Sequence, residues 1–130
     1  MAGDLFKYEV DPLSQRGPNK LAAVVPSGIT SSDRLLQVLY EELQLPSYFG
    51  FNWNALSDCL RDLHWVSHRD VFIIHEELPA LSRSDLEVYL EVLDECSRDW
   101  KAEEAHRVVV VFPQARRAEI DSLIGAAASD

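Results

Sequence analysis

Three short apolar runs constrain the fold of this chain most strongly. They are residues 21–25, 71–74 and 108–112, and each consists almost entirely of aliphatic and aromatic side chains. Unbroken runs of this length are typical of strands that are buried on both faces, as in a parallel sheet covered by helices. The sequence therefore predicts an α/β fold built on a three-stranded parallel sheet.

The segments between these runs show the spacing of helices. The first helix is expected to begin at Ser31 or Ser32 and to end before Pro46, and the second to extend from Asn52 to Trp65. A brief helical turn is expected over residues 76–81. A long helix should follow from Ser84, which forms the capping box Ser84-x-x-Glu87. With a short C-terminal helix, about four helices should cover the sheet.

The length of 130 residues favours one domain. Residues 20–112 are expected to form it. Residues 1–19 form an N-terminal extension, in which the alternation from Leu5 to Val10 suits an added edge strand. Residues 113–130 form a C-terminal extension with a short helix over residues 116–127.

The negative charge is concentrated in the centre of the chain. The formal net charge is −10; residues 33–104 contain sixteen acidic and six basic side chains, whereas the flanks contain six of each. Such a field repels nucleic acid and anionic membranes and attracts a basic partner. The chain has no apolar run of membrane-spanning length, and charges interrupt its first twenty residues. We therefore expect a cytoplasmic protein that binds neither nucleic acid nor membrane.

The usual catalytic patterns are missing from the sequence. His75-Glu76-Glu77 is not a zinc-protease motif, and His64 and His68, although spaced i, i+4, lack a third nearby ligand. Cys59 and Cys96 occupy apolar helix positions and are interpreted as buried, reduced thiols. The sequence predicts no metal, no cofactor and no enzymatic activity, with a small metal-dependent hydrolase as an alternative.

Residues 45–60 combine a helix end, an aromatic loop and a helix start. Pro46 cannot continue the first helix, Gly50 permits a tight turn, and Asn52 is a good N-cap. The aromatic side chains of this segment are either buried in the core or exposed as contacts for a partner. They are Tyr48, Phe49, Phe51 and Trp53. The apolar stripe of the second helix predicts which residues face outward: Asn54, Ser57, Asp58, Arg61 and Trp65.

This segment resembles the signature of the barstar family, intracellular inhibitors of secreted ribonucleases. The signature reads Leu-Pro-x-Tyr-Tyr-Gly-x-Asn-x-(Asp/Asn)-Ala-Leu-x-Asp-Cys-Leu, and the chain matches it at nearly every fixed position from Leu45 to Leu60. The resemblance implies a barstar-like fold and a monomeric antitoxin or immunity protein. Such a protein would block the basic active site of a cytotoxic ribonuclease in a 1:1 complex, through an acidic loop and helix.

The resemblance also implies a set of partner-binding residues. Tyr48 matches the loop aromatic that packs on a catalytic group, Asp58 the central aspartate, and Glu95 a peripheral acidic contact. Asn54 and Ser57 are departures: they stand where the prototype of the family carries an aspartate that contacts the enzyme and a tryptophan. A barstar-like regulator of a non-ribonuclease partner is the alternative. The full candidate set is Tyr48, Phe49, Gly50, Asn52, Asn54, Ser57, Asp58, Arg61, Trp65 and Glu95.

Overall fold

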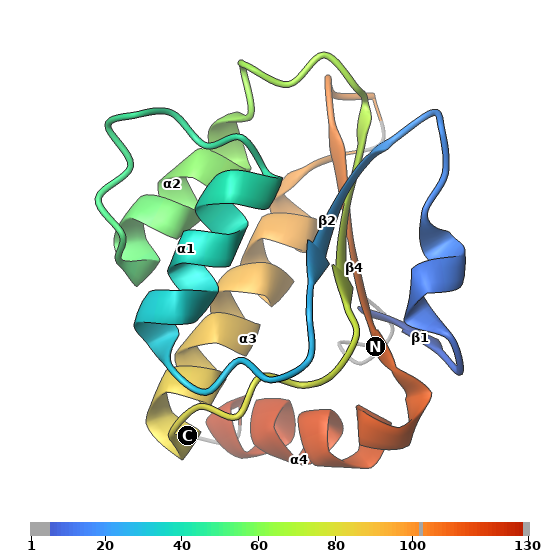
Figure 1. Ribbon diagram of the computed structural model, residues 1–130, viewed down its shortest axis with the longest axis vertical. Coiled ribbons are helices and arrows are strands. Elements are labelled where there is room, and N and C mark those ends of the chain that lie inside the picture. The colour runs from blue at the N-terminus through green and yellow to red at the C-terminus, as the bar shows by residue number, and fades with distance from the viewer. Residues whose placement is uncertain (1–5, 102, 129–130) are drawn as a thin grey trace.

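The computed structural model describes residues 6–101 and 103–128 (Figure 1). Its centre is a parallel sheet with the strand order β1-β4-β3-β2. The three predicted apolar runs form β2 (Leu21–Val25), β3 (Asp70–His75) and β4 (Arg107–Pro113). Strand β2 lies at one edge of the sheet, and β3 and β4 lie in its middle. The expected edge strand is present as β1 (Phe6–Glu9), which pairs with β4. The α/β prediction is confirmed, and the sheet has four strands where the domain was expected to have three.

Four α-helices accompany the sheet within the described residues. Helices α1, α2 and α3 lie against one face, and α4 packs across the end of the molecule near the C-terminus (Figure 1). The N-terminal segment, with its short 3₁₀ turn, lies on the opposite face. The bounds are α1 (Ser32–Glu42), α2 (Trp53–Asp62), α3 (Arg83–Asp99) and α4 (Arg117–Ala128), with 3₁₀ turns at η2 (Pro12–Gln15) and η3 (Gln114–Arg116).

Side-chain oxygens cap the first three helices. Ser31 accepts a hydrogen bond from the N–H of Arg34 at 3.1 Å, which selects it over Ser32 as the N-cap of α1. Asn52 caps α2, as predicted. The N-cap of α3 is Ser82, which accepts from the N–H of Asp85 at 3.2 Å. The predicted capping box at Ser84 is wrong because this earlier serine, with an acidic residue three positions later, already starts the helix.

Two further expectations about helices are wrong. Helix α2 ends at Asp62 instead of Trp65, because Leu63 adopts a left-handed backbone with φ 51° that terminates the helix. Residues 76–81 form no helical turn. Their backbone is instead bonded to the end of β2 and to the loop that follows it: Glu76 N–H donates to the carbonyl of Val25, and Ala80 N–H to that of Ile29.

The sheet is covered on both faces. The main core lies between the sheet and the helices, and a smaller cluster of Phe72, Ile74 and Val111 lies on the other face. Leu13 of η2 packs against this second cluster, and the Lys20 ammonium lies 3.7 Å from the centre of the Phe72 ring. The N-terminal extension therefore packs against the sheet.

One polar side chain is fully enclosed in the main core. The His75 Nδ1 atom lies 2.9 Å from the Val111 carbonyl oxygen, and Nε2 lies 2.6 Å from the Tyr89 hydroxyl. Because a carbonyl can only accept, Nδ1 carries the proton and Nε2 accepts from Tyr89. Burial lowers the pKa of His75 to about 4 and raises the pKa of Tyr89. The pair is therefore uncharged at neutral pH.

Within the part of the chain that the structure describes, no helix is both long enough and apolar enough to cross a membrane.

Candidate partner-binding surface

The loop between α1 and α2 is fixed at its base. Leu43 ends α1, and the N–H of Leu45 donates back to the carbonyl of Tyr40 at 3.0 Å. The indole N–H of Trp65 donates to the Leu43 carbonyl at 3.1 Å, so it satisfies a carbonyl that the helix end leaves unpaired. Trp65 was expected to face outward. The structure places it half-buried against the core, at the base of the loop.

Gly50 and Asn52 fix the outer part of the loop. The Asn52 side chain accepts from the N–H of Ala55 at 2.8 Å and donates to the carbonyl of Gly50 at 3.2 Å. A Cβ atom at Gly50 would lie 3.2 Å from Asn52 Nδ2, so glycine leaves room for this cap. The left-handed backbone of this turn lies not at Gly50 but at the next residue, Phe51, with φ 52°.

The aromatic side chains of the loop divide between core and solvent. Phe49 is 4% exposed and lies in the core, whereas Tyr48 is 69% exposed and Phe51 41% exposed. Phe49 thus supports the loop from inside and does not present its ring to a partner. Phe51 was missing from the candidate set. Loops have no hydrophobic periodicity, so its exposure could be suspected only from its place between a glycine and an N-cap.

The outward face of α2 is as the periodicity predicts. Asn54 and Asp58 are exposed, and Ser57 is half-buried with its carbonyl 3.8 Å from the Cys96 sulfur. Within the described part of the chain, no hydrogen bond or ion pair engages the Asp58 carboxylate. Asp62, one turn later, is bonded to Nδ1 of His64 at 2.8 Å. Asp58 is therefore a free anion at the centre of this face.

Arg61 joins α2 to α3. Its guanidinium lies 3.3 Å from the Glu95 carboxylate and 3.1 Å from that of Asp99, and all three side chains are about half exposed. Glu95, a candidate partner contact, is thus already paired in the free protein. We give the name loop–α2 surface to five exposed candidates together with the exposed Phe51: Tyr48, Phe51, Asn54, Asp58, Arg61 and Glu95.

The cysteines and histidines near this surface have structural roles. Cys59 and Cys96 are free and buried, and burial raises the pKa of both thiols, so they are protonated at neutral pH. His64 and His68 lie beyond the end of α2, which removes the helical spacing that made them a candidate metal pair. Among the described residues, no three metal-ligating side chains gather in one place.

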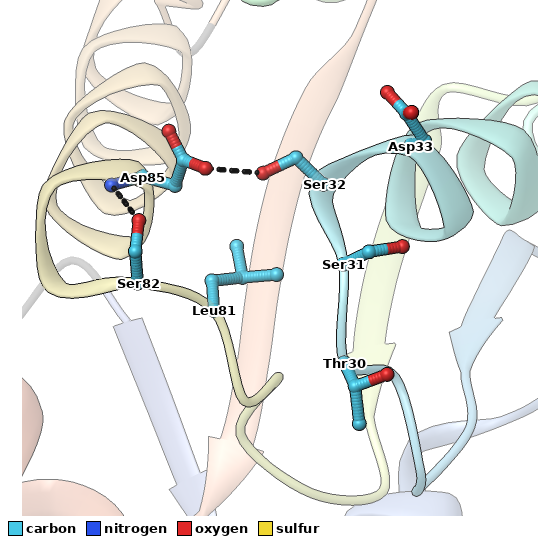
Figure 2. A pocket seen from close by; sticks show the side chains of 7 residues that line it. All are labelled: Thr30, Ser31, Ser32, Asp33, Leu81, Ser82 and Asp85. Carbon is cyan, nitrogen blue, oxygen red and sulfur yellow. Dashed lines mark hydrogen bonds between the residues drawn. The ribbon is translucent and has the colours of Figure 1, made fainter.

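Away from this surface, a hollow of about 310 Å³ lies between the N-terminal ends of α1 and α3 (Figure 2). The Ser32 hydroxyl points toward the Asp85 carboxylate and donates to it at 2.8 Å, and the Ser82 oxygen accepts from the Asp85 N–H. These groups therefore bond to each other and hold the two helix ends together.

Residues 19–113 match the family model described as Barstar (barnase inhibitor). The chain belongs to the barstar family. The matched region begins just before β2, ends with β4 and includes the whole loop–α2 surface. Barstars are non-enzymatic inhibitors, so membership confirms the prediction that the chain is not an enzyme and removes the hydrolase alternative. No curated protein matches the chain in a sequence search.

Proposed function

We propose that this barstar blocks the active site of a basic, cytotoxic ribonuclease by inserting its loop–α2 surface, as an antitoxin or immunity protein in a 1:1 complex. The observation that carries the proposal is the exposed Asp58 carboxylate, which has no partner in the free protein. A ribonuclease cleft binds phosphates with cationic side chains. A carboxylate that is free and already positioned can take the place of a phosphate there.

The charge of the molecule supports the same partner. The net charge is −10, and its excess lies in the segment that contains α1, α2, β3 and α3. A field of this sign accelerates the approach of a basic protein. Association with the partner should therefore be fast at low ionic strength and slower as salt screens the charges.

Asn54 and Ser57 direct the choice of partner. Asn54 is exposed and uncharged, and Ser57 offers no large apolar side chain at its half-buried position. Because specificity is a difference between two affinities, these departures are expected to favour a barnase-like enzyme whose cleft meets a neutral group here. Barnase itself should be inhibited weakly.

Asp58→Ala and Asp62→Ala form a matched pair for testing the proposal, since both remove an exposed carboxylate from α2. The variants are titrated against a panel of purified barnase-like ribonuclease domains that includes barnase. For the enzyme that the natural chain inhibits best, Asp58→Ala should cost on the order of 2 to 5 kcal/mol of affinity, because cations of the enzyme stay buried without a partner. Asp62→Ala should cost less than about 1 kcal/mol.

Equal and small losses for both variants would mean that Asp58 does not bind the enzyme. Failure of the natural chain to inhibit any member of the panel would contradict the proposal and favour a non-ribonuclease partner.

A further inference from the structure

Exposed apolar side chains gather in the loop between α1 and α2. Among the described residues, four large apolar side chains are classed as exposed, and two of them, Tyr48 and Phe51, lie three residues apart in this loop. Single exposed apolar residues are ordinary on a protein surface. Two aromatic rings in one short loop, beside a free carboxylate on the following helix, are the composition of an interface centre.

The backbone at Phe51 is unfavourable for its side chain. Its φ of 52° lies in the left-handed region, which bulky residues rarely adopt and which glycine or asparagine would occupy more easily. The conformation is imposed from both sides, because Asn52 bonds to the carbonyl of Gly50 and also caps α2. An unfavourable conformation that its neighbours hold in place is a feature of functional sites.

The Phe51 ring is held on its inner side. Its centroid lies 5.0 Å from that of Tyr40 and 4.9 Å from that of Phe49, both in tilted arrangements. Phe49 is in turn stacked on Tyr40, with the centroids 6.1 Å apart. The ring is thus fixed before any partner arrives, and 41% of the residue stays in contact with water.

We infer that Phe51 inserts its exposed ring edge into an apolar recess of the ribonuclease, next to the cationic cleft that receives Asp58. Tyr48, in the same loop, extends this apolar contact. The inference rests on the proposed function and adds to it the kind of partner that fits: a basic protein with an apolar recess at the rim of its cleft. Because the ring is already fixed, its insertion costs little conformational entropy.

Phe51→Asn tests this contact, because asparagine tolerates the left-handed backbone and lacks the ring. Binding is measured to the ribonuclease domain of the panel that the natural chain inhibits best. The affinity should fall roughly 10- to 100-fold, mainly through faster dissociation, as is usual when a buried aromatic contact is removed. Val10→Asn is the matched control, since Val10 is 86% exposed but lies just after β1; it should leave the affinity unchanged.

Two further variants separate contact from folding. Phe51→Gly removes the ring and suits the left-handed backbone, so it should fold, as judged by thermal unfolding, and show the same loss of affinity. Phe51→Leu keeps an apolar side chain and should retain more affinity than either. The loss at Phe51→Asn should also be similar at about 50 mM and about 500 mM salt, whereas the loss at Asp58→Ala should shrink as charges are screened.

Unchanged affinity in folded Phe51→Asn and Phe51→Gly would overturn the inference. If Asp58→Ala weakens binding in the same experiment, the proposed function stands and the aromatic contact alone fails. If the natural chain binds no ribonuclease of the panel, both fail together.

Discussion

His75 makes the stability of the core depend on pH at the scale of a single residue. In the folded chain its ring is neutral, because Nε2 must accept the Tyr89 hydroxyl and the surroundings exclude water. In the unfolded chain the same ring is protonated below its ordinary pKa of about 6.5. The folded pKa of about 4 is therefore the lower one, and the stability that the neutral ring contributes is lost as the pH falls from about 6.5 towards about 4.

We expect the free energy of unfolding to fall by about 3 kcal/mol over this window, with a slope approaching 1.4 kcal/mol per pH unit. Denaturant titrations at several pH values measure it. His75→Gln can still donate to one partner and accept from the other but does not titrate, so its curve should be flatter over the same window. Parallel curves for the natural chain and this variant would show that other groups cause the acid sensitivity.

Single-residue predictions from the sequence succeeded where a helical stripe defined the inward face. The exposure of Asp58 followed from the apolar spacing of Leu56, Cys59 and Leu60, and the structure agrees. The loop gave no such pattern. Phe49 is buried and Phe51 is exposed in a turn where Phe51 has a left-handed backbone and Asn52 bonds on either side of it. Because both residues are phenylalanine, the residue type could not indicate which one is buried.

At the scale of elements, α2 and α3 are joined across their exposed edges by Arg61. The guanidinium pairs with Glu95 and Asp99, so the one basic side chain of α2 is held toward α3 and not toward Asp58. Ion pairs between exposed groups contribute little to stability. The main effect of Arg61 is therefore on the charge that an approaching partner meets.

Arg61→Gln should raise the association rate with the basic ribonuclease a few-fold at low salt, because it removes a repelling cation from the surface that docks. Thermal unfolding should change little, because ion pairs between exposed groups contribute little to stability. Stopped-flow mixing gives the rate. Arg83→Gln, at the start of α3, makes the same change in net charge and should have a smaller effect. A slower association for Arg61→Gln would mean that Arg61 itself contacts the partner.

Element boundaries were predicted less well than element types. The three apolar runs were found because a buried parallel strand needs no alternation. The N-cap of α3 is Ser82 and the C-cap of α2 is Leu63; several neighbouring residues were plausible caps, and the sequence did not select between them. Residues 76–81 are irregular, and their backbone bonds to the end of β2 and to the loop after it, a contact that local sequence does not reveal.

At the scale of the whole molecule, the N-terminal segment completes the sheet and covers its second face. Phe72, Ile74 and Val111 are buried there beneath Leu13, and β1 pairs with β4. The family match begins at residue 19 and leaves this segment out. The alternation of apolar and polar residues indicated the edge strand, whereas a single leucine in a turn-rich segment gave no sign that Leu13 would cover the second face.

Removal of residues 1–19 should destabilise the fold by several kcal/mol, since each large apolar side chain returned to water costs about 1.5–3 kcal/mol. Denaturant unfolding and binding of a hydrophobic dye measure the loss. Leu13→Ser tests the cover without deleting β1 and should show a smaller loss in the same direction. Val10→Ser, at a residue that is 86% exposed, is its control. If the truncated chain is as stable as the full one, covering the second face of the sheet with the N-terminal segment does not contribute to stability.

The pairing of β1 with β4 has a consequence for synthesis on the ribosome. Phe6 is aligned with Val110, so β1 leaves the ribosome about a hundred residues before its neighbour β4. At about 5–20 residues per second, this strand waits for roughly 5 to 20 seconds before its edge of the sheet exists. The loop and α2 emerge well before that moment. The loop–α2 surface is thus made early, while the sheet that supports it is completed only when β4 emerges.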